Sequence, residues 1–179
     1  MESEPKLLSA AQLVAMRDAM LGQMQFARDY TLTLLSGVPD DLWTVAPPGL
    51  PTHFSWQIGH LAVAQYGLML FRQRGRAEVD LELMPSALRK RYARASSPAL
   101  DGTEPHSRTE MMAILDRIHR EAMDCVRHLS PEVLAEPTEM PYTAYPIKLG
   151  ALLFCPLHES IHAGQIGLLR RAHGLAPVR

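Results

Sequence analysis

The chain lacks the features that would place it in a membrane, on nucleic acid or in a disulfide-rich class. Its 179 residues include only two cysteines, Cys125 and Cys155, and no CxxC pair, so no disulfide framework is indicated. The longest strongly apolar stretch, residues 149–157, is far shorter than the ~20 residues that span a bilayer. The formal net charge is −1, which gives no overall attraction to nucleic acid or anionic membranes.

The remaining composition is that of an ordinary globular protein, with 47% apolar and 21% charged residues. Residues 1–6 are acidic and polar and do not resemble a signal peptide, so we expect a cytoplasmic protein. The length fits one domain with a substantial core, and neither repeats nor low-complexity segments interrupt it. We therefore expect a single domain over residues 1–179.

Helical patterns dominate the chain, and patterns typical of strands are almost absent. Apolar residues recur at spacings near 3.6 behind two capping boxes, Ser9 with Gln12 and Ser107 with Glu110. Ser55 is the expected cap of a second helix. We expect four long helices, at about 9–36, 55–75, 107–129 and 148–173, with a shorter one at 85–94 and loops at 38–54, 96–105 and 136–147. The prediction is an all-α four-helix bundle with long connections.

The most informative motif is His158-Glu159-Ser160-Ile161-His162, within the last expected helix. On an α-helix, residues i and i+4 lie about 40° apart in projection and one turn apart along the axis. Both imidazoles can then bind one metal ion through a nitrogen lone pair. The alternative for such a pair is that each ring makes separate hydrogen bonds in the core.

His60 favours the metal over this alternative. It lies in the middle of the apolar stripe of the second helix, between Trp56 and Val63, where a polar ring is unusual. Bundle metal sites are built from inward side chains of facing helices. Three nitrogens from His60, His158 and His162 would leave coordination positions open to water or substrate, as in catalytic centres.

Residues 158–162 also fit the zinc-protease pattern HExxH, with Glu159 as its general base. The residues that follow argue against a protease. A metzincin needs glycine and histidine three and six residues after the second histidine, where this chain has Gln165 and Leu168. No Asp or Glu follows Glu159, and His173 is about 16 Å further along the helix than His162.

Two segments carry a family resemblance. Residues 55–61 (SWQIGHL) and 158–166 (HESIHAGQI) resemble the second-helix and fourth-helix motifs of the DinB/YfiT-like metalloenzyme family. The order and helical context agree over nearly the whole chain, although strict matching covers these two segments only. The resemblance implies an up-down-down-up bundle, a divalent metal bound by His60, His158 and His162, and a homodimer.

The family also implies a reaction, which the residues themselves do not specify. Characterised relatives include S-transferases that use bacillithiol or mycothiol and a thiol-dependent maleylpyruvate isomerase. We therefore expect a metal-dependent transferase or isomerase acting with a low-molecular-weight thiol on a small electrophile. The alternatives are a non-catalytic metal-containing binding or stress-response module and a metal-assisted small-molecule hydrolase. Three imidazoles accept zinc, nickel, iron or copper, so the metal stays open.

Several nearby residues have more than one interpretation. We expect Glu159 to face solvent or a helix neighbour rather than the metal. Gln165 is a candidate for lining the site, with a buried interhelical hydrogen bond as the alternative, and Cys155 is a buried thiol or a soft fourth ligand. Pro156 either kinks the last helix or begins it.

The remaining histidines are expected in loops or on the surface, with His53 near the mouth of the site; they are His53, His106, His119, His128 and His173. The cluster formed by Arg89, Lys90, Arg91 and Arg94 is expected to be solvated or to attract an anionic thiol.

Overall fold

The computed structural model describes residues 8–139 and 144–178, and in this part of the chain regular structure is helical, with only a single β-bridge, between Pro137 and Ile147. The long helices are α1 (Ala10–Leu35), α2 (Phe54–Gln65), α6 (Arg108–Arg127) and α8 (Lys148–Ala172). The short ones are α3 (Arg72–Arg74), α4 (Asp80–Leu83), α5 (Ser86–Arg91) and α7 (Pro131–Ala135). The all-α prediction is confirmed. Two predicted segments, residues 1–6 and the 140–143 part of the loop, lie outside the described residues.

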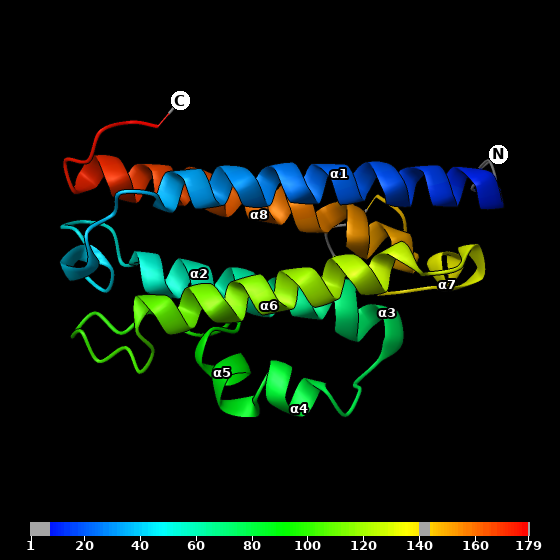
Figure 1. The fold of residues 1–179 in the computed structure, drawn as a ribbon, viewed down its shortest axis with the longest axis horizontal. Coiled ribbons are helices and arrows are strands. Elements are labelled where there is room, and N and C mark those ends of the chain that lie inside the picture. The colour runs from blue at the N-terminus through cyan, green and yellow to red at the C-terminus, as the bar shows by residue number, and fades with distance from the viewer. Residues whose placement is uncertain (1–7, 140–143, 179) are drawn as a thin grey trace, which may run out of the picture.

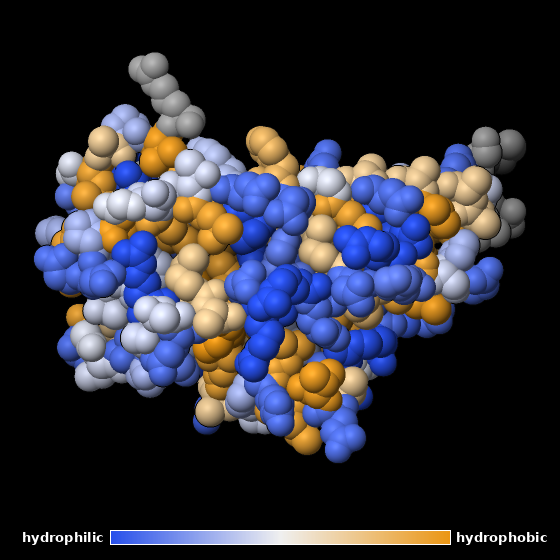
Figure 2. Space-filling model, viewed as in Figure 1, coloured by the Kyte–Doolittle hydropathy of each residue, from blue (hydrophilic) through white to orange (hydrophobic). Residues whose placement is uncertain are grey.

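The long helices pack in two pairs, α1 against α8 and α2 against α6 (Figure 1). Further contacts between α2 and α8 and between α1 and α6 close the core between the pairs. The outward face of α6 is charged, through Asp116, Arg117, Arg120 and Glu121, and Figure 2 shows this face as mostly hydrophilic. α6 therefore buries one apolar face, as the sequence periodicity predicts, whereas most residues of α2 are buried.

Both predicted capping boxes are present. The backbone N–H of Ser9 donates to Gln12 Oε1 at 2.9 Å, and that of Ser107 donates to Glu110 Oε2 at 2.7 Å. Gly174 follows α8 with φ of 72°, a left-handed conformation that costs glycine little. These local signals fix the helix ends where the sequence places them.

The second helix differs from its prediction at its first residues and in its interior, but the helical run ends at Gly75 as expected. Its cap is His53, whose Nδ1 accepts a hydrogen bond from the backbone N–H of Trp56 at 3.2 Å, while Ser55 is buried within the first turn. Beyond α2 the helix continues as a π-helical segment, Tyr66–Phe71, and then as α3 up to Gly75. A π-helical segment widens the helix locally and is often found beside functional sites.

Pro156 lies inside α8, which begins eight residues earlier at Lys148. The interpretation of Pro156 as a first-turn residue is therefore wrong. His158 and His162 lie on one uninterrupted helix. Across the described residues, none of the helices is both long and apolar enough to cross a membrane.

The excursion between the second and third long helices packs against the bundle through Tyr92. A Cβ added at Gly59 would lie 2.4 Å from Tyr92 Cδ1, so only glycine permits this approach of the ring to α2. Tyr92 is fully buried, and its hydroxyl donates to Glu104 Oε2 at 2.7 Å. The excursion is thereby fixed against the helix that carries His60.

Candidate metal centre

The three predicted histidines meet where α2 faces α8. The ring centroid of His60 lies 5.2 Å from that of His158 and 4.8 Å from that of His162, and the last two are 4.5 Å apart. One nitrogen of each ring can be chosen so that all three nitrogens lie within 4.8 Å of one another. Nitrogens bound to one zinc ion at about 2.0–2.1 Å lie closer together, so small side-chain rotations would complete the site. The side chains fit a divalent metal in both chemistry and placement.

Two of the three rings are oriented by a hydrogen bond at the ring nitrogen Nδ1. His60 Nδ1 lies 2.8 Å from the backbone oxygen of Tyr92, and His162 Nδ1 lies 2.6 Å from Gln57 Oε1. Both oxygens are acceptors, so each Nδ1 carries the proton and each Nε2 keeps its lone pair. Metal-bound histidines typically make such a contact through the other ring nitrogen. The hydrogen bonds therefore prepare Nε2 of both rings for a metal.

Aromatic neighbours hold the rings further. Trp56 stacks on His60 with centroids 4.9 Å apart and planes inclined by 3°, and its indole N–H donates to Ser96 Oγ at 3.3 Å. Phe154 contacts His158 at 5.8 Å between centroids. Trp56 is therefore next to the site. The packing restricts ring rotation, which reduces the entropy lost when a ligand orders the site.

Burial favours the neutral form of each imidazole. Desolvation lowers the pKa of His60 although its hydrogen bond to the Tyr92 backbone opposes the shift. Desolvation, followed by the charge of the neighbouring rings, lowers the pKa of His158 to about 4 and that of His162 to about 3. At neutral pH the rings are uncharged and present lone pairs, so protons compete little with a metal.

The histidines open into a groove of about 650 Å³ between α2 and α8. His60 and His162 are each only 7% exposed, and His158 is partly buried. The walls beyond the rings are apolar, and Arg72 and Arg94 lie at the rim. A metal held by the three rings would thus have one side accessible to a small molecule.

Glu159 does not face solvent but contacts a neighbouring helix, which is the other position expected for it. Its carboxylate is 1% exposed and accepts two hydrogen bonds from Arg28 of α1, from Nε at 2.7 Å and from Nη2 at 2.9 Å. Arg28 also donates to Gln65 Oε1, and the Gln65 amide donates to Nδ1 of His119, which is buried rather than superficial. Glu159 is engaged in this network, so the structure offers it no role as a metal ligand.

Other sequence candidates lie away from the histidines. Gln165 is exposed, so neither of its expected roles is observed. Cys155 is buried and belongs to the core, where burial raises the pKa of its thiol. His53 is fully buried rather than at the mouth, and its Nε2 lies 3.5 Å from Glu104 Oε1.

Two arginines of the predicted basic cluster are not simply solvated. Arg91 pairs with Glu104 at 3.0 Å, and Arg94 lines the groove beside the histidines.

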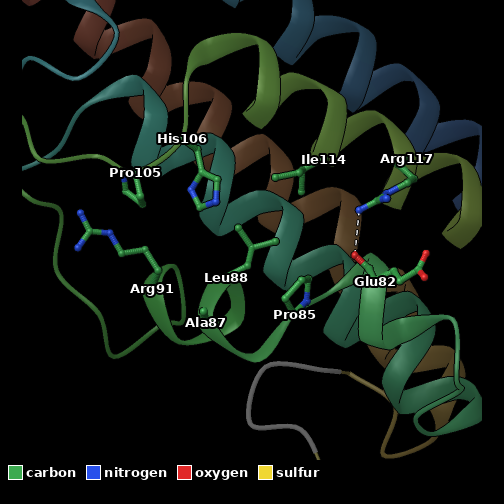
Figure 3. Close-up of a pocket in the computed structure, with 9 residues that line it drawn as sticks. All are labelled: Glu82, Pro85, Ala87, Leu88, Arg91, Pro105, His106, Ile114 and Arg117. Carbon is green, nitrogen blue, oxygen red and sulfur yellow. Dashed lines mark hydrogen bonds between the residues drawn. The ribbon is translucent and has the colours of Figure 1, made fainter.

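A second pocket lies between the excursion and α6 and is shown in Figure 3. It has a volume of about 460 Å³, and its residues include one histidine, His106. Arg117 Nη2 donates to the backbone oxygen of Glu82 at 3.0 Å across one end of it (Figure 3). Of its lining residues only His106 and Glu82 carry metal-ligand groups, and Figure 3 shows them far apart, so this pocket does not resemble a metal site.

The comparison with protein families agrees with these motifs. A family model described as the DinB superfamily matches residues 23–166, which include α2, α6 and all three histidines. The chain therefore belongs to the DinB superfamily. No curated protein matches the chain. The family membership and the histidine cluster together define a helical DinB-like protein whose three histidines lie close enough to bind a metal ion.

Proposed function

We propose that this protein is a metal-dependent enzyme that joins a low-molecular-weight thiol, through its sulfur, to a small electrophile, or that isomerises such a molecule with the help of the thiol. The observation that carries the proposal is the convergence of three neutral imidazoles at one end of an accessible groove. His60, His158 and His162 would bind one divalent metal, with zinc, nickel and iron as the expected candidates.

In the proposed reaction, the metal, the residues behind the histidines and the groove walls would have separate roles. A bound divalent metal lowers the pKa of a coordinated thiol or water. Gln57 and the Tyr92 backbone would keep the Nδ1 proton of His162 and His60 in place. The apolar walls of the groove would exclude water from the reacting end of the substrate. No general base is assigned, because Glu159 is engaged by Arg28.

The finer architecture belongs to the same proposal. We infer an up-down-down-up bundle, because in Figure 1 α1 and α8 run in one direction and α2 and α6 in the other. A cytoplasmic homodimer that acts on small molecules, with neither nucleic acid nor a membrane as partner, is what the resemblance and the composition favour. Light scattering on the purified protein tests the dimer.

Turnover with thiols tests the proposed reaction. The protein would be reconstituted separately with zinc, nickel and iron, and assayed with cysteine, glutathione, bacillithiol and mycothiol against an electrophile whose adduct fluoresces. We expect adduct formation that requires both metal and thiol, is lost in His158→Ala and is retained in His128→Ala, which alters an exposed histidine. Metal-dependent ester hydrolysis without thiol would favour the hydrolase instead. Full metal loading with no turnover of either kind would favour a binding module.

A further inference from the structure

The groove beside the histidines is elongated, and its two walls follow from helix geometry. His60, Val63, Ala64, Gly67 and Leu68 recur at the spacing of one helix face, and Arg72 follows one turn later. From His60 to Arg72 is twelve residues, which is at most about 18 Å along the axis. The groove therefore runs from the histidines at one end towards Arg72 at the other.

The middle of the groove offers a ligand almost no side-chain hydrogen bonds. Between the histidines and Arg72 its walls are apolar, formed by Val63, Ala64, Leu68, Phe154 and Ile161. Gly67 lies within the π-helical segment, and a Cβ added there would meet nothing within 4 Å. An apolar wall binds the apolar part of a ligand, since a polar part would lose hydrogen bonds to water.

The charge of the groove has one sign. Among the described residues that line it, Arg72 and Arg94 are the only charged ones, and none is a carboxylate. Arg72 is exposed and donates from Nη1 to the backbone oxygen of Glu139 at 3.2 Å, which uses one of its five N–H donors. A guanidinium at the mouth of an apolar groove suits a carboxylate or another planar anion.

We propose that this groove binds an elongated amphipathic anion, with its apolar body along Val63, Gly67 and Phe154, its anionic group at Arg72 and its opposite end at the histidines. The part of the proposal that concerns the histidine end rests on the proposed metal site, whereas the groove itself does not. This ligand class differs from a sugar-based thiol, whose hydroxyl groups the apolar walls would leave without partners.

The first test examines the groove without metal. 11-(Dansylamino)undecanoate, whose fluorescence rises in apolar surroundings, would be titrated into the metal-free protein beside its neutral methyl ester. We expect the acid to bind at least about tenfold tighter than the ester, because the ester lacks the charge-assisted contact with Arg72. In Arg72→Gln the two should bind alike, while Arg76→Gln, a nearby exposed arginine outside the groove, should behave as wild type.

Gly67→Leu should fill the groove and weaken the acid at least about tenfold. Gly22→Leu is the matched control, because Gly22 also lies in a helix with open space around its Cβ but belongs to α1. Equal weakening by both glycine variants, or no effect of Gly67→Leu, would overturn the proposed groove. So would equal binding of acid and ester.

The second test examines the histidine end in the cobalt-substituted protein, where a bound thiolate adds a sulfur-to-cobalt absorption band. 11-Mercaptoundecanoate, below its micelle-forming concentration, should bind at least about a hundredfold tighter than 3-mercaptopropionate, because its methylene chain is buried. Gly67→Leu should weaken the long thiol only.

The two tests separate the two proposals. If the protein bound cobalt but bound the two thiols with equal affinity, the proposal of an elongated groove ligand would be overturned, while the proposed metal site would remain supported. Failure to bind cobalt, with the dansyl acid still sensitive to Arg72→Gln and Gly67→Leu, would overturn the metal-dependent function and leave the groove standing.

Discussion

At the scale of single residues, the site depends on neutral acceptors behind the histidines. Gln57 Oε1 accepts from His162, and Gln57 in turn donates from Nε2 to Thr52 Oγ1 at 3.0 Å, which fixes its amide orientation. The Tyr92 backbone oxygen likewise accepts a hydrogen bond from Nδ1 of His60. Both contacts select the tautomer whose Nε2 is free to bind a metal.

Replacement of Gln57 tests this arrangement. We expect Gln57→Leu to weaken metal binding by roughly 10- to 100-fold, because His162 loses the acceptor that orients it. Gln57→Glu should restore affinity, since a carboxylate accepts the same Nδ1 proton. Competition with a chromophoric chelator measures the dissociation constants. Gln73→Leu, which removes another buried amide, is the control and should leave metal affinity unchanged; an equal loss in both variants would contradict the account.

Gly59 is the second residue on which the site depends. Gly59→Ala should destabilise the protein by about 1–3 kcal/mol, because its Cβ would overlap the ring of Tyr92. It should also weaken metal binding, since the displaced Tyr92 backbone is the partner of His60. Urea unfolding checks the first effect. Gly67→Ala, with open space at its Cβ, should be neutral or stabilising by up to about 1 kcal/mol. A similar response of the two glycines would refute the steric argument.

At the scale of elements, a buried polar network joins the four long helices. Arg28 of α1 binds Glu159 of α8 and Gln65 of α2, and it donates to the backbone oxygen of Leu115 in α6 at 3.3 Å. His119 of α6 completes the network through Gln65. Because Glu159 adjoins His158 in the chain, the network also fixes the rotation of α8 about its axis at the site.

A double-mutant cycle on Arg28 and Glu159 tests this role. Arg28→Met alone should cost about 3–5 kcal/mol of unfolding free energy, because it leaves a buried carboxylate without its partner. Arg28→Met combined with Glu159→Leu should recover most of that loss, as measured by urea unfolding. The exposed pair Arg120 and Asp116 is the comparison, and Arg120→Met should change stability by less than about 1 kcal/mol. If Arg28→Met cost no more than Arg120→Met, the network would have no structural role.

The contrast between local and distant signals explains what the sequence could predict. The capping boxes are four-residue patterns, and the pair at 158 and 162 is one helical turn, so both were predictable. His60 stood out because a polar ring interrupts an apolar stripe. Arg28 and Glu159 are 131 residues apart, and no periodicity links them. Gln57 lies within the recognised motif, but its contact with another helix appears only in three dimensions, as does the π-helical segment.

At the scale of the whole molecule, Glu104 ties the excursion to the bundle. Its side chain is completely buried, and it contacts Tyr92, Arg91 and His53. Burial alone would raise its pKa, but the hydrogen bonds from His53 and Tyr92 and the charge of Arg91 outweigh burial and lower the pKa to about 2. A carboxylate whose pKa falls on folding stabilises the protein above its unfolded pKa, and this contribution is lost as the pH falls through the folded value.

Acid unfolding should reveal this contribution. The unfolding free energy of the wild type should exceed that of Glu104→Gln by about 3 kcal/mol near pH 6, and this difference should shrink between about pH 4.5 and pH 2. Urea unfolding at a series of pH values measures it. Glu78→Gln, at an exposed position, should follow the wild-type curve. A constant difference between wild type and Glu104→Gln across this range would contradict the prediction.

The most direct test of the central claim is the metal content of the untagged protein. Elemental analysis after reconstitution should find about one divalent metal per chain in the wild type and in His128→Ala. His60→Ala and His162→Ala should each lose most of it, because two imidazoles bind a metal far more weakly than three. An absence of metal in the wild type, or full retention in either variant, would show that the three histidines are polar core residues rather than ligands.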